Sequence, residues 1–249
     1  MAAIAPNAAD TFVEVGPGRG VLTRALASTV ARLICVEIDR DLASRLSASL
    51  PSHVEIVTAD FLEVDVRALL GTIDGPARVA GNLPYNVASP IVFRLFAAAE
   101  EGRVLKDATI MLQKEVAERL TAEPGGAAYG PMAIQAGRLA DAHLLFTLPP
   151  GAFRPPPKVT SAVVQLRFRP SPVDVGDAQV FERVVRGAFL QRRKTLANAL
   201  APVAHALGRN VADLLARAGV DGGQRPERKA PIDQTVASTC AVSRASVLD

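Results

Sequence analysis

The segment Gly81–Asn86 (GNLPYN) carries side chains that could activate an amine. Pro84 keeps the preceding backbone extended or turned, which leaves the carbonyl groups before it free to accept hydrogen bonds. Asn82 adds a side-chain carbonyl, and Tyr85 adds a flat face for stacking on a base. Two acceptors that converge on a base-attached amine favour a pyramidal nitrogen with its lone pair aimed at an electrophile. We therefore predict that Asn82, Leu83, Pro84 and Tyr85 are catalytic, the alternative being an ordinary Asn-Pro turn with a buried Tyr.

A glycine-rich turn and two later acidic residues predict a nucleoside-binding site. Gly16, Gly18 and Gly20 follow an apolar run, where the backbone must pass close to a ligand. Their G-x-G-x-G spacing departs from the dinucleotide fingerprint and favours a cofactor that lacks pyrophosphate. Glu37 ends the next apolar run and can accept hydrogen bonds from ribose hydroxyls, while Asp60 follows the third and can accept from an adenine amine. Together these features predict S-adenosylmethionine as the cofactor.

Each member of this set also has a simpler structural explanation. The glycines could form a tight turn without a ligand, Glu37 could belong to the solvated run EIDRD, and Asp60 could cap a helix. The structural explanation is weaker for the three features together, because they occur in order at three successive strand ends.

Composition excludes several classes of protein. The chain has 249 residues, of which 49% are hydrophobic and 21% charged, so it is a folded protein of one or two domains and not a disordered, collagenous or coiled-coil one. No run approaches the roughly 18 apolar residues of a membrane span, and the start does not resemble a secretion signal, so a cytoplasmic location is expected. Cys35 and Cys240 offer no disulfide framework, and the three histidines lie far apart, so no metal site is predicted.

Strands and helices alternate over about the first 120 residues, as expected for a parallel sheet with helices on both faces. The predicted strands are Thr11–Val15, Arg32–Glu37, Val54–Thr58, a run beginning at Arg78–Ala80, and Ala108–Leu112. The predicted helices are Val21–Thr29, Arg40–Leu50 and Ile91–Ala99. Ligands of such sheets bind at the carboxyl ends of the strands, which is where the glycine-rich turn, Glu37, Asp60 and Asn82 lie.

The sequence changes character beyond Leu120. Gly-rich and Pro-rich loops precede a further predicted strand at Ala162–Phe168, and a helical pattern begins near Asp177 and ends at Gly219, a predicted helix C-cap. We divide the chain into a first domain at 1–172 and a second at 173–249.

Charge differs between the two parts of the chain. Residues 1–150 hold 13 Lys and Arg against 17 Asp and Glu, whereas residues 151–249 hold 15 against 8. A basic half is typical of a nucleic-acid enzyme, although solvated surface arginines give the same count. Arg192, Arg193 and Lys194 are candidate phosphate contacts, the alternative being a solvated helix end.

The sequence resembles the rRNA adenine N6,N6-dimethyltransferase family over most of its length and in the expected order. The matching segments are VEVGPGRGVLT, GNLPYN, MLQKEVAERL, YGPMAIQ, FRPPPKVTSAVV, FLQRRKTLANAL and RPE at residues 225–227. The resemblance implies a Rossmann-like class I methyltransferase fold, α/β, with a mostly parallel seven-stranded sheet and a small all-α C-terminal domain that binds rRNA.

By the same resemblance, Gly16, Gly18, Glu37, Asp60 and Asn82 contact S-adenosylmethionine, and Asn82 also serves the target amine. Tyr85 and Phe153 are expected to hold a flipped adenine by stacking, and Arg192, Arg193 and Lys194 to contact rRNA. The implied product carries two methyl groups on N6 of each of two adjacent adenosines near the 3′ end of small-subunit rRNA. The implied partner is the immature small ribosomal subunit, engaged by a monomer during ribosome biogenesis.

One segment departs from the family. Relatives carry a Gln-x-Phe-Leu-type segment across the cofactor, and the residues before Thr11 (MAAIAPNAAD) do not match it. We therefore expect an open cleft and weak cofactor binding, so one alternative function is a weakly active or inactive ribosome-assembly factor that binds the immature small subunit. A separate alternative, which does not depend on this segment, is a methylase of the erythromycin-resistance type that acts on 23S rRNA.

Overall fold

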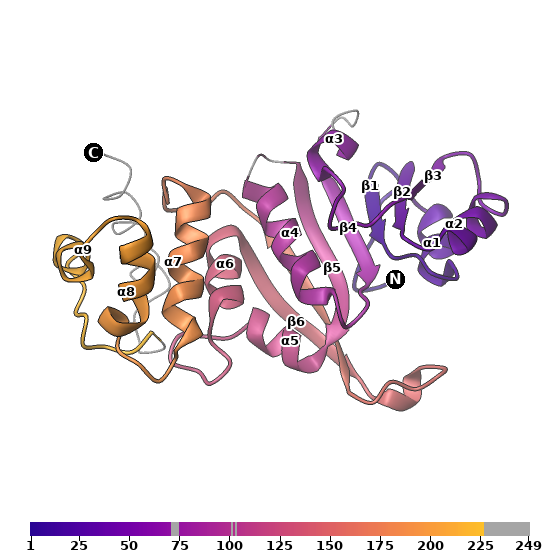
Figure 1. The fold of residues 1–249 in the computed structure, drawn as a ribbon. Helices are drawn as coiled ribbons and strands as arrows, with labels where there is room; N and C mark the ends of the chain where they lie inside the picture. Colours follow the sequence, from indigo (N-terminus) through magenta and orange to yellow (C-terminus); the bar gives the residue numbers. More distant parts are fainter. Residues whose placement is uncertain (71–74, 101, 103, 227–249) are drawn as a thin grey trace. The chain divides into compact units, whose positions relative to one another are not determined.

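The computed structural model describes residues 1–70, 75–100, 102 and 104–226 (Figure 1). The chain forms two compact units, of which the first contains residues 1–121 and 139–170. The second contains residues 122–138 and the chain from Ser171 onward. Sequence alone assigned residues 122–138 to the first domain. In the structure Tyr129, Ala133 and Ile134 of this segment pack with Phe181 and Val185, so their apolar side chains belong to the core of the second unit.

The first unit is built on one sheet of seven strands in the order β3-β2-β1-β4-β5-β7-β6. Its strands are β1 (Thr11–Val15), β2 (Arg32–Glu37), β3 (Val54–Thr58), β4 (Ala77–Asn82), β5 (Leu105–Gln113), β6 (Ala140–Leu148) and β7 (Ser161–Phe168). The first five pair in parallel, whereas β7 runs antiparallel to both β5 and β6. The expected mostly parallel sheet of seven strands is confirmed.

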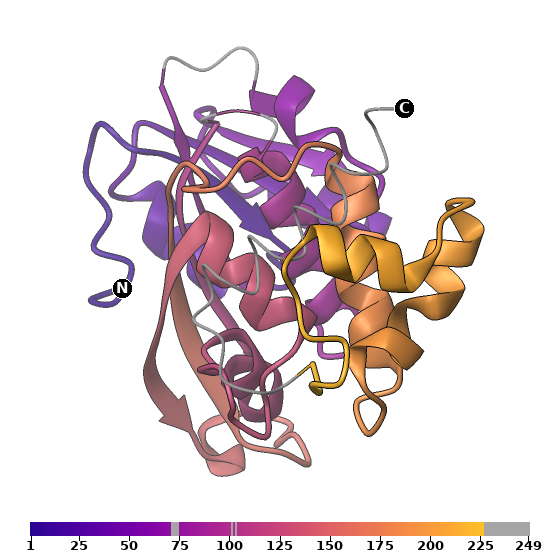
Figure 2. The same cartoon turned by 90° about the vertical axis from the view of Figure 1, so that its left-hand side faces the viewer.

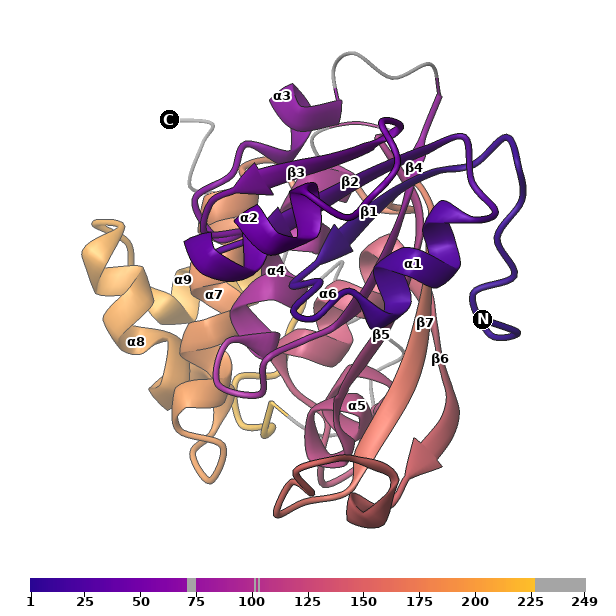
Figure 3. The same ribbon diagram turned by 90° about the vertical axis from the view of Figure 1, so that its right-hand side faces the viewer.

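Helices cover both faces of this sheet. They are α1 (Val21–Ala27), α2 (Arg40–Ser47), α3 (Val66–Leu70), α4 (Ala88–Glu100) and α5 (Lys114–Leu120), with the short 3-10 helix η1 (Pro150–Ala152) between β6 and β7. The chain moves outward from β1 to β2 and β3 in one direction and from β4 to β5 in the other. Right-handed crossovers then place α1 and α2 on the face opposite α4 (Figure 3).

The central strands form the core of the first unit because they are covered on both sides. Phe12 of β1 and Leu33 of β2 are fully buried and pack with Leu26 of α1. Cys35 of β2 is also fully buried. Strands buried on both faces read as continuous apolar runs, which is why the sequence located them well.

The described part of the second unit is all helical, drawn in magenta for α6 and in orange to yellow for the rest (Figure 2). Its helices are α6 (Pro131–Leu139), α7 (Ala178–Leu190), α8 (Leu196–Ala206) and α9 (Val211–Arg217). Asp177 caps α7 by accepting hydrogen bonds from the amides of Gln179 and Val180. A Cβ on Gly187 would overlap Val203, so glycine at this position lets α7 and α8 approach closely. Within the described ranges, the helices lack the length and apolarity that a bilayer crossing requires.

Candidate active site

The glycine-rich turn presents backbone at the carboxyl end of β1. Gly16, Gly18 and Gly20 have φ values of 66°, 56° and 77°, in the left-handed region that side chains disfavour. The Gly16 amide donates to the carbonyl of Val36 at 3.0 Å, which ties the turn to β2. A Cβ on Gly18 would meet nothing within 4 Å, so open space lies beside this residue. Backbone conformation, and not crowding by the protein, therefore requires glycine at position 18.

Glu37 joins the glycine-rich turn to the end of β2. Its Oε2 accepts a hydrogen bond from the Gly18 amide at 2.9 Å, and its Oε1 accepts one from the Asp39 amide at 3.0 Å. Glu37 is only 6% exposed. A carboxylate has about four acceptor sites, so two protein donors leave capacity for ribose hydroxyls.

Asp60 lies beside Glu37 at the next strand end. The Ala59 amide donates to the Glu37 carbonyl at 3.0 Å, which brings the ends of β2 and β3 together. Asp60 itself is half-buried, and its Oδ1 accepts from the Leu62 amide at 2.9 Å. The carboxylate thus shapes the turn after β3 and keeps further acceptor capacity.

The segment after β4 is anchored on both sides of Asn82. A Cβ on Gly81 would lie 2.7 Å from the carbonyl oxygen of Val15, so only glycine lets β4 pass this close to β1. Leu83 is buried, and its amide donates to the carbonyl of Met111 at 2.9 Å. Asn82, held between these two contacts, is exposed at the carboxyl end of β4.

The two functional turns are neighbours. A Cβ built on Gly16 would lie 3.9 Å from Cδ of Pro84, so the glycine-rich turn and the Asn82–Tyr85 turn are in van der Waals proximity. The sequence separates them by more than sixty residues, and the parallel pairing of β1 with β4 brings them together.

Tyr85 is fixed by a residue from the start of β7. Its hydroxyl lies 2.6 Å from the Ser161 hydroxyl, and Ser161 is fully buried. The ring of Tyr85 is half-buried. The Tyr85 hydroxyl is thereby held in place by a strand that sequence reasoning did not connect to this site.

A cavity of about 650 Å³ opens between these turns. Gly16, Gly18 and Asn82 line it, whereas Glu37, Asp60, Tyr85 and Phe153 are not among its lining residues. Its further lining includes Glu14, Thr109, Met111, Phe146 and Arg154, all of which sequence reasoning missed. Two of them had a signal in the sequence: Glu14 lies on β1, two residues before Gly16, and Arg154 follows Phe153 in the Pro-rich loop.

Glu14 is the unusual ionisable group of this cavity. It is 2% exposed, and its Oε2 lies 3.6 Å from Sγ of Cys35. Burial, aided by the negative charge of Glu37, raises the pKa of Glu14 to about 7. The Glu14 side chain therefore changes charge near neutral pH inside the cavity.

The remaining predicted residues lie elsewhere in the structure. Phe153 is half-buried at the end of η1, next to the cavity-lining Arg154. In the second unit, Arg193 and Lys194 are exposed after α7, while Nη1 of Arg192 donates to the carbonyl of Ala127 at 2.8 Å. Arg192 thus has a structural contact, which sequence reasoning did not foresee.

The residues around the cavity fit a nucleoside cofactor. Left-handed glycines keep side chains away from the cavity, and Glu37 presents a carboxylate directly beside Gly18. In the part of the chain that the structure describes, no group of three His, Cys, Asp or Glu side chains could hold a metal ion.

Known proteins with similar sequences are rRNA methyltransferases. A family profile described as Ribosomal RNA adenine dimethylase matches residues 1–235. A relative from Xanthomonas oryzae pv. oryzae named Ribosomal RNA small subunit methyltransferase A is 46% identical over 205 residues, covering 81% of this chain and 76% of its own. A relative of the same name from Acinetobacter baylyi is 42% identical over 225 residues, covering 89% of this chain and 78% of its own.

Solved structures show the same fold. The 23S rRNA methyltransferase ErmE has a TM-score of 0.66 and 26% identity, with 97% of this chain and 94% of that chain covered. A dimethyladenosine transferase from Plasmodium falciparum has a TM-score of 0.71 and 21% identity, with 95% and 91% covered, a likeness of fold alone.

Proposed function

The chain belongs to the ribosomal RNA adenine dimethylase family, and on that premise we propose that it methylates small-subunit rRNA with S-adenosylmethionine. The product is N6,N6-dimethyladenosine at two adjacent positions near the 3′ end of the rRNA. The observation that carries the proposal is the proximity of the glycine-rich turn to the Asn82–Tyr85 turn, with Gly16 and Asn82 lining one cavity.

The cofactor half of the cavity is assigned to the strand ends. Gly16 and Gly18 leave room for the cofactor, Glu37 accepts hydrogen bonds from its ribose, and Asp60 accepts from its adenine amine. When bound, the cofactor supplies an activated methyl group on a sulfonium centre. Glu37 already holds the Gly18 amide, so the ribose acceptor and the glycine backbone are positioned together before the ligand arrives.

The target half is assigned to the segment after β4. The Asn82 side-chain carbonyl and a backbone carbonyl of the turn accept the two N–H bonds of the target amine, which directs the nitrogen lone pair towards the methyl group. Tyr85, held by Ser161, stacks on the flipped adenine, and Phe153 covers its other face. The amine nitrogen would take the methyl group in line as the bond between that methyl group and the sulfonium breaks and S-adenosylhomocysteine leaves. The methylated amine would then give its proton to water, so the protein needs no strong general base.

The second unit is assigned to rRNA binding. Arg193 and Lys194 are exposed there and neutralise phosphate, with Arg192 beside them. The enzyme acts as a monomer on the immature small subunit during ribosome biogenesis.

Sequence identity to the relatives favours the small subunit over the large subunit as the substrate. The relatives at 42–46% identity carry the name of a small-subunit methyltransferase, whereas the 23S rRNA methyltransferase is 26% identical. The intact Asn82–Tyr85 turn likewise favours an active enzyme over an assembly factor without activity.

The test is methyl transfer to isolated subunits. Small and large subunits from a strain that lacks the modification are incubated with this protein and S-adenosylmethionine labelled in the methyl group, and the labelled nucleotides are mapped. We expect two adjacent dimethylated adenosines in the small subunit and none in the large subunit. Label in the large subunit would favour the erythromycin-resistance type, and binding without label would favour the assembly factor.

A further inference from the structure

Arg78 is a buried cation on β4, four residues before Asn82. It belongs neither to the glycine-rich turn nor to the Asn82–Tyr85 turn. The residue is 7% exposed. Its Nε donates to both carboxylate oxygens of Asp107, at 2.9 and 3.1 Å. Asp107 is its register partner on β5, so this half of the guanidinium joins two neighbouring strands.

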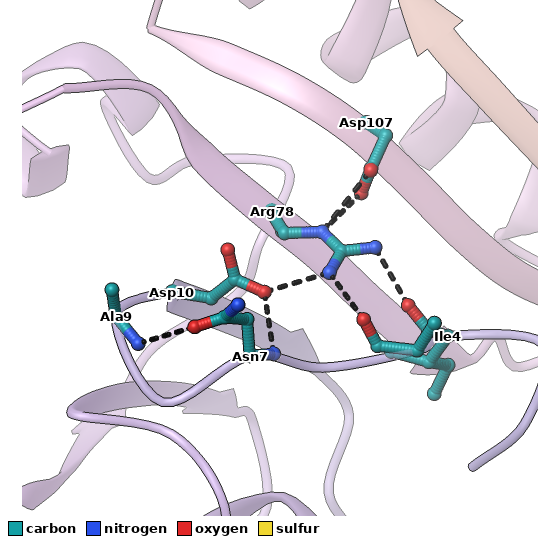
Figure 4. A network of polar contacts seen from close by, with 7 residues as sticks. Ile4, Asn7, Ala9, Asp10, Arg78 and Asp107 are labelled. Carbon is teal, nitrogen blue, oxygen red and sulfur yellow. Dashed lines mark hydrogen bonds and ion pairs between the residues drawn. The ribbon is translucent and has the colours of Figure 1, made fainter.

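The other half of the guanidinium holds the segment that precedes β1 (Figure 4). Nη1 donates to Oδ2 of Asp10 at 2.7 Å and to the carbonyl of Ala5 at 3.0 Å, and Nη2 donates to the carbonyl of Ile4 at 2.6 Å. All three acceptors belong to residues 1–10, which we call the N-terminal segment. Arg78 thus fastens this segment to the sheet by the main chain as well as by a charged side chain.

The N-terminal segment has a defined conformation at the residues that accept hydrogen bonds from Arg78. The amides of Ile4 and Ala5 both donate to the carbonyl of Met1, at 3.0 and 2.9 Å. Ala5 has a φ of 44°, the positive value that non-glycine residues adopt at an energetic penalty. The Ile4 side chain is buried with Phe12 and Leu26. The strained turn persists because Arg78 and this core contact hold it from two sides.

The held segment forms part of the cavity wall. Met1, Ala3 and Ile4 line the same cavity as Gly16 and Asn82. An open cleft is expected beside these residues, because residues 1–10 do not match the family's Gln-x-Phe-Leu-type segment. In the structure, residues of this different sequence nevertheless border the cavity, and Arg78 donates hydrogen bonds to the carbonyl groups of Ile4 and Ala5.

We propose that Arg78 is a positioning residue for cofactor binding, which acts by holding the N-terminal segment as one wall of the cofactor cavity. This inference rests on the proposed use of S-adenosylmethionine at that cavity. The ionisation of Asp10 supports a lasting ion pair between Asp10 and Arg78. Burial of Asp10 disfavours its charged form, but hydrogen bonds from Arg78 and the Asn7 amide outweigh this and lower the pKa of Asp10.

The two halves of the guanidinium allow positioning to be separated from fold stability. Asp10→Ala removes the charged contact to the N-terminal segment and leaves the pair of Arg78 with Asp107 intact. Arg78→Gln loses both. Asp221→Ala is the matched control for Asp10, because Asp221 is an exposed aspartate of the second unit that also accepts from a nearby amide, that of Gly223. Arg32→Gln, which breaks a more exposed ion pair with Glu55, is the control for Arg78.

Calorimetry with S-adenosylmethionine, steady-state methyl transfer and hydrogen exchange by mass spectrometry are measured on the full chain. For Asp10→Ala we expect the cofactor Kd and KM to rise roughly tenfold, as for one lost charge-assisted hydrogen bond, with kcat at saturation unchanged. Amide exchange in residues 1–10 should accelerate, and both controls should behave as the parent.

A folded Asp10→Ala variant with the parent's cofactor Kd and the parent's exchange in residues 1–10 would overturn the inference. If the Arg78→Gln variant folds, its cofactor Kd should rise more than that of Asp10→Ala. If Arg78→Gln does not fold, the Asp10→Ala variant alone tests the inference. Failure of the parent itself to bind S-adenosylmethionine would instead refute the proposed function.

Discussion

At the scale of single residues, the proposed reaction chemistry is concentrated at Asn82. Its neighbours Gly81 and Leu83 are fixed by contacts with β1 and β5, so the backbone that carries the Asn82 side chain is held at the cavity. We expect Asn82→Ala to lower the rate of methyl transfer by about 10²–10³, as for other preorganised hydrogen-bonding groups, and to leave rRNA affinity unchanged. Single-turnover transfer and filter binding measure the two effects. Asn198→Ala, an exposed change on α8, is the control.

A rate for Asn82→Ala within tenfold of the parent would remove this side chain from the mechanism. Equal losses in rate and in rRNA affinity would indicate instead that the substitution disturbs the substrate-binding surface as a whole.

Glu14 predicts a dependence of stability on pH. Its pKa is raised from 4.5 to about 7, so between these values the folded protein keeps a proton that the unfolded chain has released. The free energy of unfolding therefore falls as pH rises through this window, and stays lowered above it. The fall is at most about 3 kcal/mol, at roughly 1.4 kcal/mol per pKa unit.

Glu14→Gln, which is neutral throughout, should remove this fall and be more stable than the parent above pH 7. Denaturant unfolding across the window measures the effect, with Glu55→Gln, an exposed glutamate on β3, as the control. Parallel curves for the parent and Glu14→Gln would show that Glu14 is ionised in the folded protein throughout this range.

At the scale of elements, the close approach of β1 and β4 positions the site. A Cβ on Gly81 would lie 2.7 Å from the Val15 carbonyl oxygen, and backbone cannot move aside as a flexible side chain can. We expect Gly81→Ala to lower the free energy of unfolding by about 1–3 kcal/mol, as overpacking does, and to reduce methyl transfer by displacing Asn82. Thermal unfolding of Gly151→Ala, where a Cβ meets nothing within 4 Å, gives the comparison. A Gly81→Ala variant as stable as Gly151→Ala would contradict this account.

The contact between β7 and the Asn82–Tyr85 turn predicts a coupled pair of substitutions. Tyr85→Phe and Ser161→Ala each remove one partner of the 2.6 Å hydrogen bond while keeping the aromatic ring. We expect each to lower kcat/KM several-fold, in line with about 1 kcal/mol for one net hydrogen bond, and the double variant to be no worse than either. Additive losses in the double variant would mean that the two side chains act independently.

At the scale of the whole molecule, the basic second unit should control affinity for rRNA. Replacing Arg192, Arg193 and Lys194 together by Gln is expected to weaken binding to the small subunit and flatten its salt dependence. Each lost phosphate contact lowers the log–log slope by about 0.7–0.9. The cofactor Kd, set in the first unit, should not change.

The same charge change in Arg40, Arg45 and Arg67, which are exposed on α2 and α3, is the control for this triple variant. Thermal unfolding is measured alongside, because Arg192 also contacts the Ala127 carbonyl. An unaltered salt slope in the triple variant would identify the cluster as a solvated helix end.

The sequence by itself determined the parallel sheet and the order of the site along it. Buried parallel strands read as apolar runs, and their carboxyl ends are marked by Gly16, Glu37, Asp60 and Asn82. These are local signals, each contained within a few residues, so they need no knowledge of the tertiary fold. Edge strand β6 had no such signal, since most of its side chains are exposed and its pairing with β7 defines it.

Only the tertiary structure decided how distant residues meet. Arg78 bonds the carbonyl of Ile4, 74 residues away, and Tyr85 bonds Ser161, 76 residues away. Segment 122–138 likewise joins the second unit because its apolar residues pack with α7. Nothing in the local sequence pattern specifies a hydrogen-bond partner, since an arginine or a tyrosine can bond to many different groups. The choice is made by strand order and register, which bring particular partners within hydrogen-bonding reach.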